Sequence, residues 1–108
     1  MTNLIQVHTT AGTEQEAYAI ARLLVERGLA ACAQVSGPVT SHYRWNGKVE
    51  ESSEWQCTAK TTAAAFPAVE SAIRETHSYD MPQIVAMSIL LASADYAQWV
   101  ADSVCAPD

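Results

Sequence analysis

The chain has 108 residues, of which 49% are hydrophobic and 17% are charged, and its formal net charge is −6 at pH 7. This composition excludes an intrinsically disordered segment, which needs low hydrophobicity and high charge to remain unfolded. It also argues against partners such as nucleic acid or an anionic membrane, because the six Lys and Arg residues are scattered singly. We expect a single domain over residues 1–108 with one core.

The start of the chain and its cysteines bear on the compartment. Residues 1–12 lack the basic start, the long apolar run and the cleavage site of a secretory signal. No stretch approaches the ~20 apolar residues that span a membrane. Three cysteines cannot all pair with one another, and they show no zinc-ligand spacing. We therefore expect a cytoplasmic, reducing location.

The first residues predict a strand followed by a helix. Leu4–Thr10 is a short, largely apolar run that is typical of a strand. Thr13, with Glu16 three residues later, forms a capping box at the start of a helix expected over residues 14–27. Gly28 stands where a left-handed helix C-cap is expected.

A long hairpin is expected next. Residues 29–36 are nearly continuously apolar, which predicts a central strand, and Gly37-Pro38 predicts a bend or bulge after it. The chain resumes as a strand over Val39–Trp45. Asn46-Gly47 predicts a type I′ turn, and the returning strand runs to about Thr61.

The turn fixes the register of the hairpin and therefore which of its side chains face one another. Counting outward from Asn46-Gly47 gives the facing pairs Trp45–Lys48, Tyr43–Glu50 and His42–Glu51. A two-stranded ribbon is marginal alone in water, and aromatic residues on such a ribbon are typical of an interface. We favour packing on another copy of the chain; the alternative is folding over its own sheet. Glu50, Glu51 and Glu54 are interpreted as carboxylates on a solvated edge.

The second half predicts a helix, a loop, a strand and a last helix. Residues 63–76 have a helical apolar stripe, with Pro67 in the first turn, and 77–82 form a loop. Residues 84–91 are apolar on both faces and predict a last core strand. Ser93 or Asp95 is expected to cap a short helix whose inner side carries Tyr96, Trp99 and Val100. Residues 106–108 are expected to fray.

The order of these elements predicts the fold class. Two β-α-β units joined by a hairpin give an α+β, ferredoxin-like β-α-β-β-α-β sandwich with one antiparallel sheet and two helices on one face. A long β-hairpin and a short C-terminal helix are added to it.

Few residues point to chemistry. The sequence has no nucleophile elbow, no glycine-rich phosphate loop and no His-Glu-x-x-His motif. His77 is the best single candidate, because it ends a helix and opens an irregular loop with Tyr79 and Asp80. The alternative is a helix cap. Lys60 is either a surface lysine or an anion-binding group near His77 and Tyr79.

Several segments together carry a family resemblance. Leu29–Ala33, Tyr43–Glu51, Ala59–Thr61, His77–Pro82 and Asp95–Trp99 resemble, in order and spacing, the divalent-cation tolerance protein family, CutA. The resemblance implies a ferredoxin-like fold related to the PII signalling proteins and a PII-like homotrimer in which hairpins extend each sheet into the next subunit. It also implies a cytoplasmic role in divalent metal tolerance, with copper most often named. Members of the family are not established as enzymes.

The family's copper ligands carry over only in part. They are assigned to a cysteine in the first strand and to a pair of histidines, and these positions hold Thr9 and Thr76-His77 here. His77 is therefore the one metal ligand that we expect. One imidazole without a thiolate makes a poor copper site, since soft-metal selectivity needs several N or S donors. We expect copper or another divalent cation to be bound weakly, or between subunits.

Three functional hypotheses follow. The first is a non-enzymatic trimeric module that responds to metal ions and binds a metal or small ligand at inter-subunit clefts containing Trp45, Lys60 and Tyr79. The second is an uncharacterised enzyme in which His77 acts as acid or base, for which the sequence identifies no partner group. The third is a structural trimeric hub that anchors partner proteins.

Overall fold

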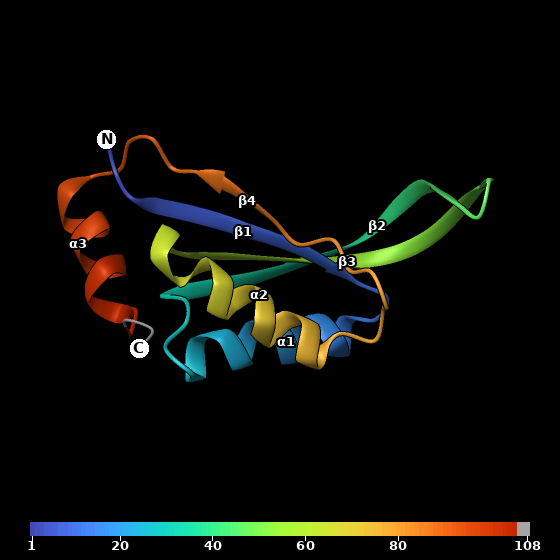
Figure 1. Ribbon diagram of the computed structural model, residues 1–108, viewed down its shortest axis with the longest axis horizontal. Coiled ribbons are helices and arrows are strands. Elements are labelled where there is room, and N and C mark those ends of the chain that lie inside the picture. The colour runs from blue at the N-terminus through green and yellow to red at the C-terminus, as the bar shows by residue number, and fades with distance from the viewer. Residues whose placement is uncertain (106–108) are drawn as a thin grey trace.

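Four strands form one antiparallel sheet in the order β2-β3-β1-β4, and α1 and α2 cover one face of it (Figure 1). The computed structural model describes residues 1–105, so the predicted fraying of residues 106–108 lies outside the described residues. The elements are β1 (Leu4–Ala11), α1 (Glu14–Glu26), β2 (Cys32–Trp45), β3 (Lys48–Thr62), η1 (Ala63–Ala65), α2 (Phe66–Thr76), β4 (Val85–Ser88) and α3 (Ala94–Ser103). The predicted α+β, ferredoxin-like arrangement is confirmed.

The start of α1 matches its sequence signals, except that Glu16 bonds a residue outside the helix. The hydroxyl of Thr13 accepts a hydrogen bond from the backbone N–H of Glu16 at 3.1 Å, as an N-cap should. The Glu16 carboxylate, however, accepts hydrogen bonds from the backbone N–H and hydroxyl of Ser78 instead of closing the capping box. The first turn of α1 is thereby tied to the loop that follows α2.

The core lies between the sheet and the two helices. It contains buried residues of α1 and α2 packed against those of β1 and β3, namely Ile20, Leu24, Val69, Ile73, Val7, Cys57 and Ala59. The apolar stripes of both helices face the sheet, as their periodicity predicts.

Residues 29–36 do not form a central strand. The backbone N–H groups of Leu29 and Ala30 bond the carbonyl of Leu24 at the end of α1, so β2 begins only at Cys32, and it is an edge strand. The apolar run predicts a strand buried between two neighbours. It instead reflects packing under α1, which buries Ala30 completely.

The last strand is also different from the expectation. Only Val85–Ser88 pair with β1, at the second edge of the sheet, and all four residues are exposed. The rest of the apolar run 84–91 continues as irregular chain with Leu90 and Leu91 exposed. Of the three residues predicted on the inner side of α3, Val100 is buried whereas Tyr96 and Trp99 are partly exposed. Hydrophobic side chains in this part of the sequence favour burial, but the described chain leaves most of them exposed to solvent.

The hairpin has the predicted register and projects beyond the body. All three predicted pairs flanking Asn46-Gly47 are present, and Asn46 and Gly47 both have positive φ. The predicted irregularity lies between Ser36 and Val39, where the register shifts. The distal part of the hairpin extends past the helices (Figure 1), and the radius of gyration, 14.4 Å, exceeds the ~13 Å of a compact domain of this length.

Candidate functional site

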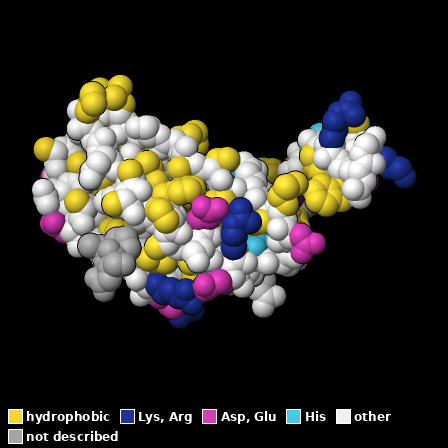
Figure 2. Space-filling view, in the orientation of Figure 1, with side chains coloured by type: hydrophobic (Ala, Val, Ile, Leu, Met, Phe, Trp, Pro, Cys, Tyr) yellow, Lys and Arg dark blue, Asp and Glu magenta, His cyan; other side chains and the backbone are white. Residues whose placement is uncertain are grey.

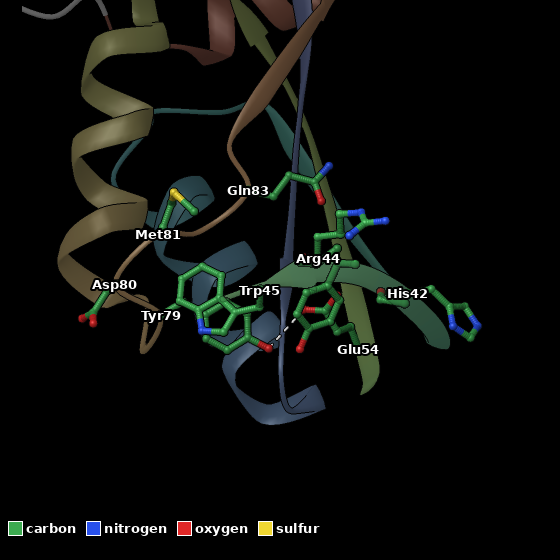
Figure 3. A pocket seen from close by; sticks show the side chains of 11 residues that line it. His42, Arg44, Trp45, Glu54, Tyr79, Asp80, Met81 and Gln83 are labelled. Carbon is green, nitrogen blue, oxygen red and sulfur yellow. Dashed lines mark hydrogen bonds between the residues drawn. The ribbon is translucent and has the colours of Figure 1, made fainter. Parts of the chain in front are cut away.

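A cavity of about 570 Å³ lies between the distal arm of β2 and the loop that leads to β4. Its volume is in the range of small-molecule sites. Figure 3 shows the side chains that line it, which come from β1, β2, β3 and the loop: Thr10, Ser41, His42, Tyr43, Arg44, Trp45, Glu54, Tyr79, Asp80, Met81 and Gln83. Segments far apart in the sequence therefore meet at one pocket.

A tyrosine–carboxylate pair forms part of the wall of this pocket. The hydroxyl of Tyr79 donates a hydrogen bond of 3.1 Å to Oε2 of Glu54, whose residue is only 8% exposed. Burial, and then the nearby Glu54 carboxylate, raise the pKa of Tyr79 to about 12. The Tyr79 ring lies against Gly12, where an added Cβ would stand 3.0 Å from the phenolic oxygen. Tyr79 therefore contacts both Glu54 and Gly12, which restricts the position of its ring.

His77 lies behind the wall and shapes the loop. Its side chain is 0% exposed. Its Nε2 lies 2.7 Å from the carbonyl oxygen of Thr10, and the backbone N–H of Tyr79 donates to Nδ1 at 3.1 Å. These partners assign Nε2 as the donor and Nδ1 as the acceptor, because the carbonyl needs a donor and the N–H needs an acceptor. His77 therefore fixes the backbone of Tyr79 against β1.

The contact between Glu16 and Ser78 attaches the same loop to α1. The Glu16 carboxylate accepts from the Ser78 backbone N–H at 2.7 Å and from its hydroxyl at 2.9 Å, and Oε1 lies 3.4 Å from Nδ1 of His77. Three consecutive residues of the loop are thus tied to α1, β1 and β3. The loop is irregular in conformation but firmly attached.

The structure brings together some of the predicted site residues and separates others. Trp45 and Tyr79 line the same cavity, whereas His77 supports its wall without lining it. Lys60 lies six residues along β3 from Glu54, about 20 Å away at the rise of a strand. Within one chain, Lys60 is therefore remote from Trp45 and Tyr79.

Glu54 is the site residue that sequence reasoning missed. It was interpreted as part of a solvated acidic edge with Glu50 and Glu51. Those two residues are exposed, but Glu54 is buried beneath Tyr79. The available signal was its place at the end of the hairpin next to the body of the sheet, where β3 pairs with β1 from Trp55 onward.

The residues present do not fit a copper site. Among residues 1–105, no group of three His, Cys, Asp or Glu side chains is placed to hold a metal ion. Both nitrogens of His77 are engaged in hydrogen bonds, which leaves no lone pair for a metal. Thr9 is buried opposite Cys57, and burial raises the pKa of that thiol to about 11, so it does not supply a thiolate at neutral pH.

The raised pKa of Tyr79 predicts a distinct alkaline titration. Its pKa is about 12 in the folded chain against an ordinary value of 10.0, so ionisation opposes folding. The Tyr79 contribution to stability is expected to be complete below pH 10 and to be lost as the pH rises through about 12. Tyrosinate absorbance should show a late step that disappears in Tyr79→Phe and moves to lower pH in Glu54→Gln. An unchanged late step in Tyr79→Phe would contradict the assignment.

The sheet order and the pocket define a ferredoxin-like α+β module with a ligand-sized cavity under a long hairpin. The profile of the family described as CutA1 divalent ion tolerance protein matches residues 5–103. The chain is also 38% identical over 94 residues to the divalent-cation tolerance protein CutA of Thermus thermophilus, covering 87% of this chain and 91% of that protein. The chain therefore belongs to the CutA1 divalent ion tolerance family.

Solved structures agree with this assignment. A CutA structure from Xylella fastidiosa has a TM-score of 0.93 at 28% identity, covering 96% of this chain and 100% of that chain. The divalent cation tolerance protein from Thermus thermophilus has a TM-score of 0.92 at 36% identity, covering 94% and 99%. The human protein CutA is longer: it is 37% identical over 91 residues, which are 84% of this chain and 51% of that protein.

One relative corrects the predicted compartment. A solved structure from Archaeoglobus fulgidus, with a TM-score of 0.89 and 31% identity over 93% of this chain and 97% of that chain, is described as the periplasmic divalent cation tolerance protein CutA. The predicted cytoplasmic location is therefore wrong as an inference from family and sequence. It rested on the composition of residues 1–12, on the three cysteines and on the family resemblance, none of which identifies a compartment. No helix among residues 1–105 is long and apolar enough to cross a membrane.

Proposed function

We propose that this chain acts in divalent-cation tolerance as a non-enzymatic, PII-like homotrimer that takes a small ligand in the pocket under the hairpin. The observation that carries the proposal is the meeting of Trp45 and Tyr79 around the buried carboxylate of Glu54 in one cavity. An apolar cavity with a few placed polar groups is typical of a binding site. Membership of the CutA1 divalent ion tolerance family supports the link to divalent cations.

The open edges of the sheet support a trimer. Neither β2 nor β4 has a neighbour on its outer side within the described chain, and an unpaired edge readily pairs with another chain. The exposed hydrophobic side chains include Val85, Met87, Leu90, Leu91 and Trp99, which belong to β4, α3 and the segment between them. Figure 2 shows hydrophobic side chains on the end of the molecule that carries α3. Shared cover between subunits would bury these groups.

The trimer would turn the pocket into an inter-subunit cleft. Trp45 and Tyr43 stand on the projecting arm, where both are partly exposed and free to meet a neighbouring subunit. Lys60 joins such a cleft only from another subunit, because it lies about 20 Å away in its own chain. His77 supports the cleft through the backbone of Tyr79. An acid–base role for His77 is not favoured, because neither ring nitrogen faces the cavity unpartnered.

Copper is expected to bind weakly, because the donor set of the described residues does not fit it. Calorimetric titration of the intact protein with Cu²⁺ should give an affinity weaker than about 1 μM, equivalent to less than about 8 kcal/mol. His77→Gln is the informative variant, since an amide keeps one donor and one acceptor but removes the imidazole. We expect its isotherm to match that of the parent protein. Tight, stoichiometric uptake that His77→Gln abolishes would overturn this part of the proposal.

A further inference from the structure

We propose that the pocket recognises a small organic cation, an ammonium or guanidinium group attached to an apolar or aromatic portion. This inference rests on the proposed function in one respect, namely that the cavity is a binding site. Glu54 would pair with the positive group, and Trp45 and Tyr43 would contact it and its apolar portion. The family and its relatives are named for divalent cations, which are a different class of ligand.

Glu54 is a buried carboxylate with an incomplete set of partners. Within residues 1–105 its one side-chain hydrogen bond comes from the neutral hydroxyl of Tyr79, on Oε2. No Lys, Arg or His of the described chain lies within ion-pair distance of it. A buried charge is costly unless it is paired with an opposite charge. A cation in the cavity would give this carboxylate the opposite charge that it lacks.

Aromatic side chains surround the space beside this carboxylate. Tyr43 and Trp45 are two residues apart on β2 and so project from the same face of the strand, and Tyr79 enters from the loop. The faces of such rings attract ammonium and guanidinium groups. The Tyr79 hydroxyl donates a hydrogen bond to Glu54, so it orients the carboxylate and adds no competing charge at neutral pH.

The remaining lining residues favour an organic cation over a metal ion or an anion. In Figure 3 the side chains of Asp80 and His42 point away from the space between Tyr79, Trp45 and Glu54. This leaves one carboxylate, whereas Ca²⁺ takes six to eight oxygen ligands. A cavity of about 570 Å³ is also far larger than a bare ion needs. Arg44 is the one guanidinium among the lining residues, and it stands on the exposed arm of the hairpin.

Three probes of the same shape test the charge preference. Benzylammonium, benzyl alcohol and benzoate differ in charge while they share the aromatic ring, and each is titrated into the intact protein by calorimetry or by NMR. We expect benzylammonium to bind best. Glu54→Gln, which keeps an acceptor for Tyr79, should weaken it by about tenfold or more, as expected for loss of a hydrogen bond to a charged group. Lys48→Gln, at the exposed turn of the hairpin and outside the lining of the cavity, is the matched control and should leave the affinity unchanged.

The outcomes separate this inference from the proposed function. Trp45→Ala, a change on the exposed arm, should also weaken benzylammonium binding and gives a second test if Glu54→Gln fails to fold. If benzoate binds best and Arg44→Gln removes that binding, the cavity is a binding site for anions and only the cation inference is overturned. If none of the three probes binds, the cavity is not the binding site, and both proposals are overturned.

Discussion

His77→Ala is expected to lower the free energy of unfolding by about 2–5 kcal/mol. The imidazole is inaccessible to solvent and satisfies two backbone groups, the carbonyl of Thr10 and the N–H of Tyr79. Truncation leaves both groups without their partner, each at about 1–3 kcal/mol, and adds a cavity. Urea denaturation of both proteins at one fixed protein concentration measures the difference, because the stability of an oligomer depends on concentration.

His42→Ala is the matched control for that change. The side chain of His42 is 65% exposed on the hairpin and lies 3.7 Å from Glu51, so its loss should alter the free energy of unfolding by less than about 0.5 kcal/mol. Equal effects of the two substitutions would show that His77 does not hold the loop as described. A large effect of His77→Ala that Gln restores in part would support the donor and acceptor roles assigned to its two nitrogens.

Val85→Glu is expected to convert the proposed trimer into a monomer. Val85 stands on the edge strand β4 in the exposed apolar surface that we propose is covered by a neighbouring subunit. A carboxylate buried there without a partner would cost several kcal/mol in each subunit contact, on the order of 2–7 kcal/mol for a buried polar group alone. Sedimentation equilibrium at micromolar protein concentration measures the change in mass.

Val25→Glu provides the same substitution outside that surface. Val25 lies on α1 and is 43% exposed, close to the 45% of Val85, so both variants introduce a charge at a similarly accessible valine. We expect Val25→Glu to retain the mass of the parent protein. If both variants dissociate, or if neither does, β4 is not the interface.

The fold could be predicted from local signals where those signals were strong. Asn46-Gly47 fixed the hairpin register because few residue pairs tolerate positive φ at both central positions. The cap at Thr13 likewise set the start of α1. The errors share a physical cause. Residues 29–36 and 84–91 are apolar, so they are expected to be covered by another part of the protein. Composition alone does not say whether that cover is a neighbouring strand, a helix or another subunit.

The candidate site was less predictable because its contacts are long-range. The aromatic hairpin and the irregular loop 77–82 suggest a shared cleft for Trp45 and Tyr79, and both residues line one cavity. The partner of His77 is the carbonyl of Thr10, 67 residues away, and backbone acceptors leave no mark in the sequence. Glu54 resembles its solvated neighbours in the hairpin, but it is buried and accepts a hydrogen bond from Tyr79, 25 residues away in the sequence.

The mass of the protein in solution tests the central claim most directly. We propose that the projecting hairpin, the open strand edges and the pocket beneath Trp45 belong to an assembly of three chains. Sedimentation equilibrium at low micromolar concentration should therefore give three times the 11.7 kDa of one chain. A well-folded particle of 11.7 kDa under the same conditions would contradict the account.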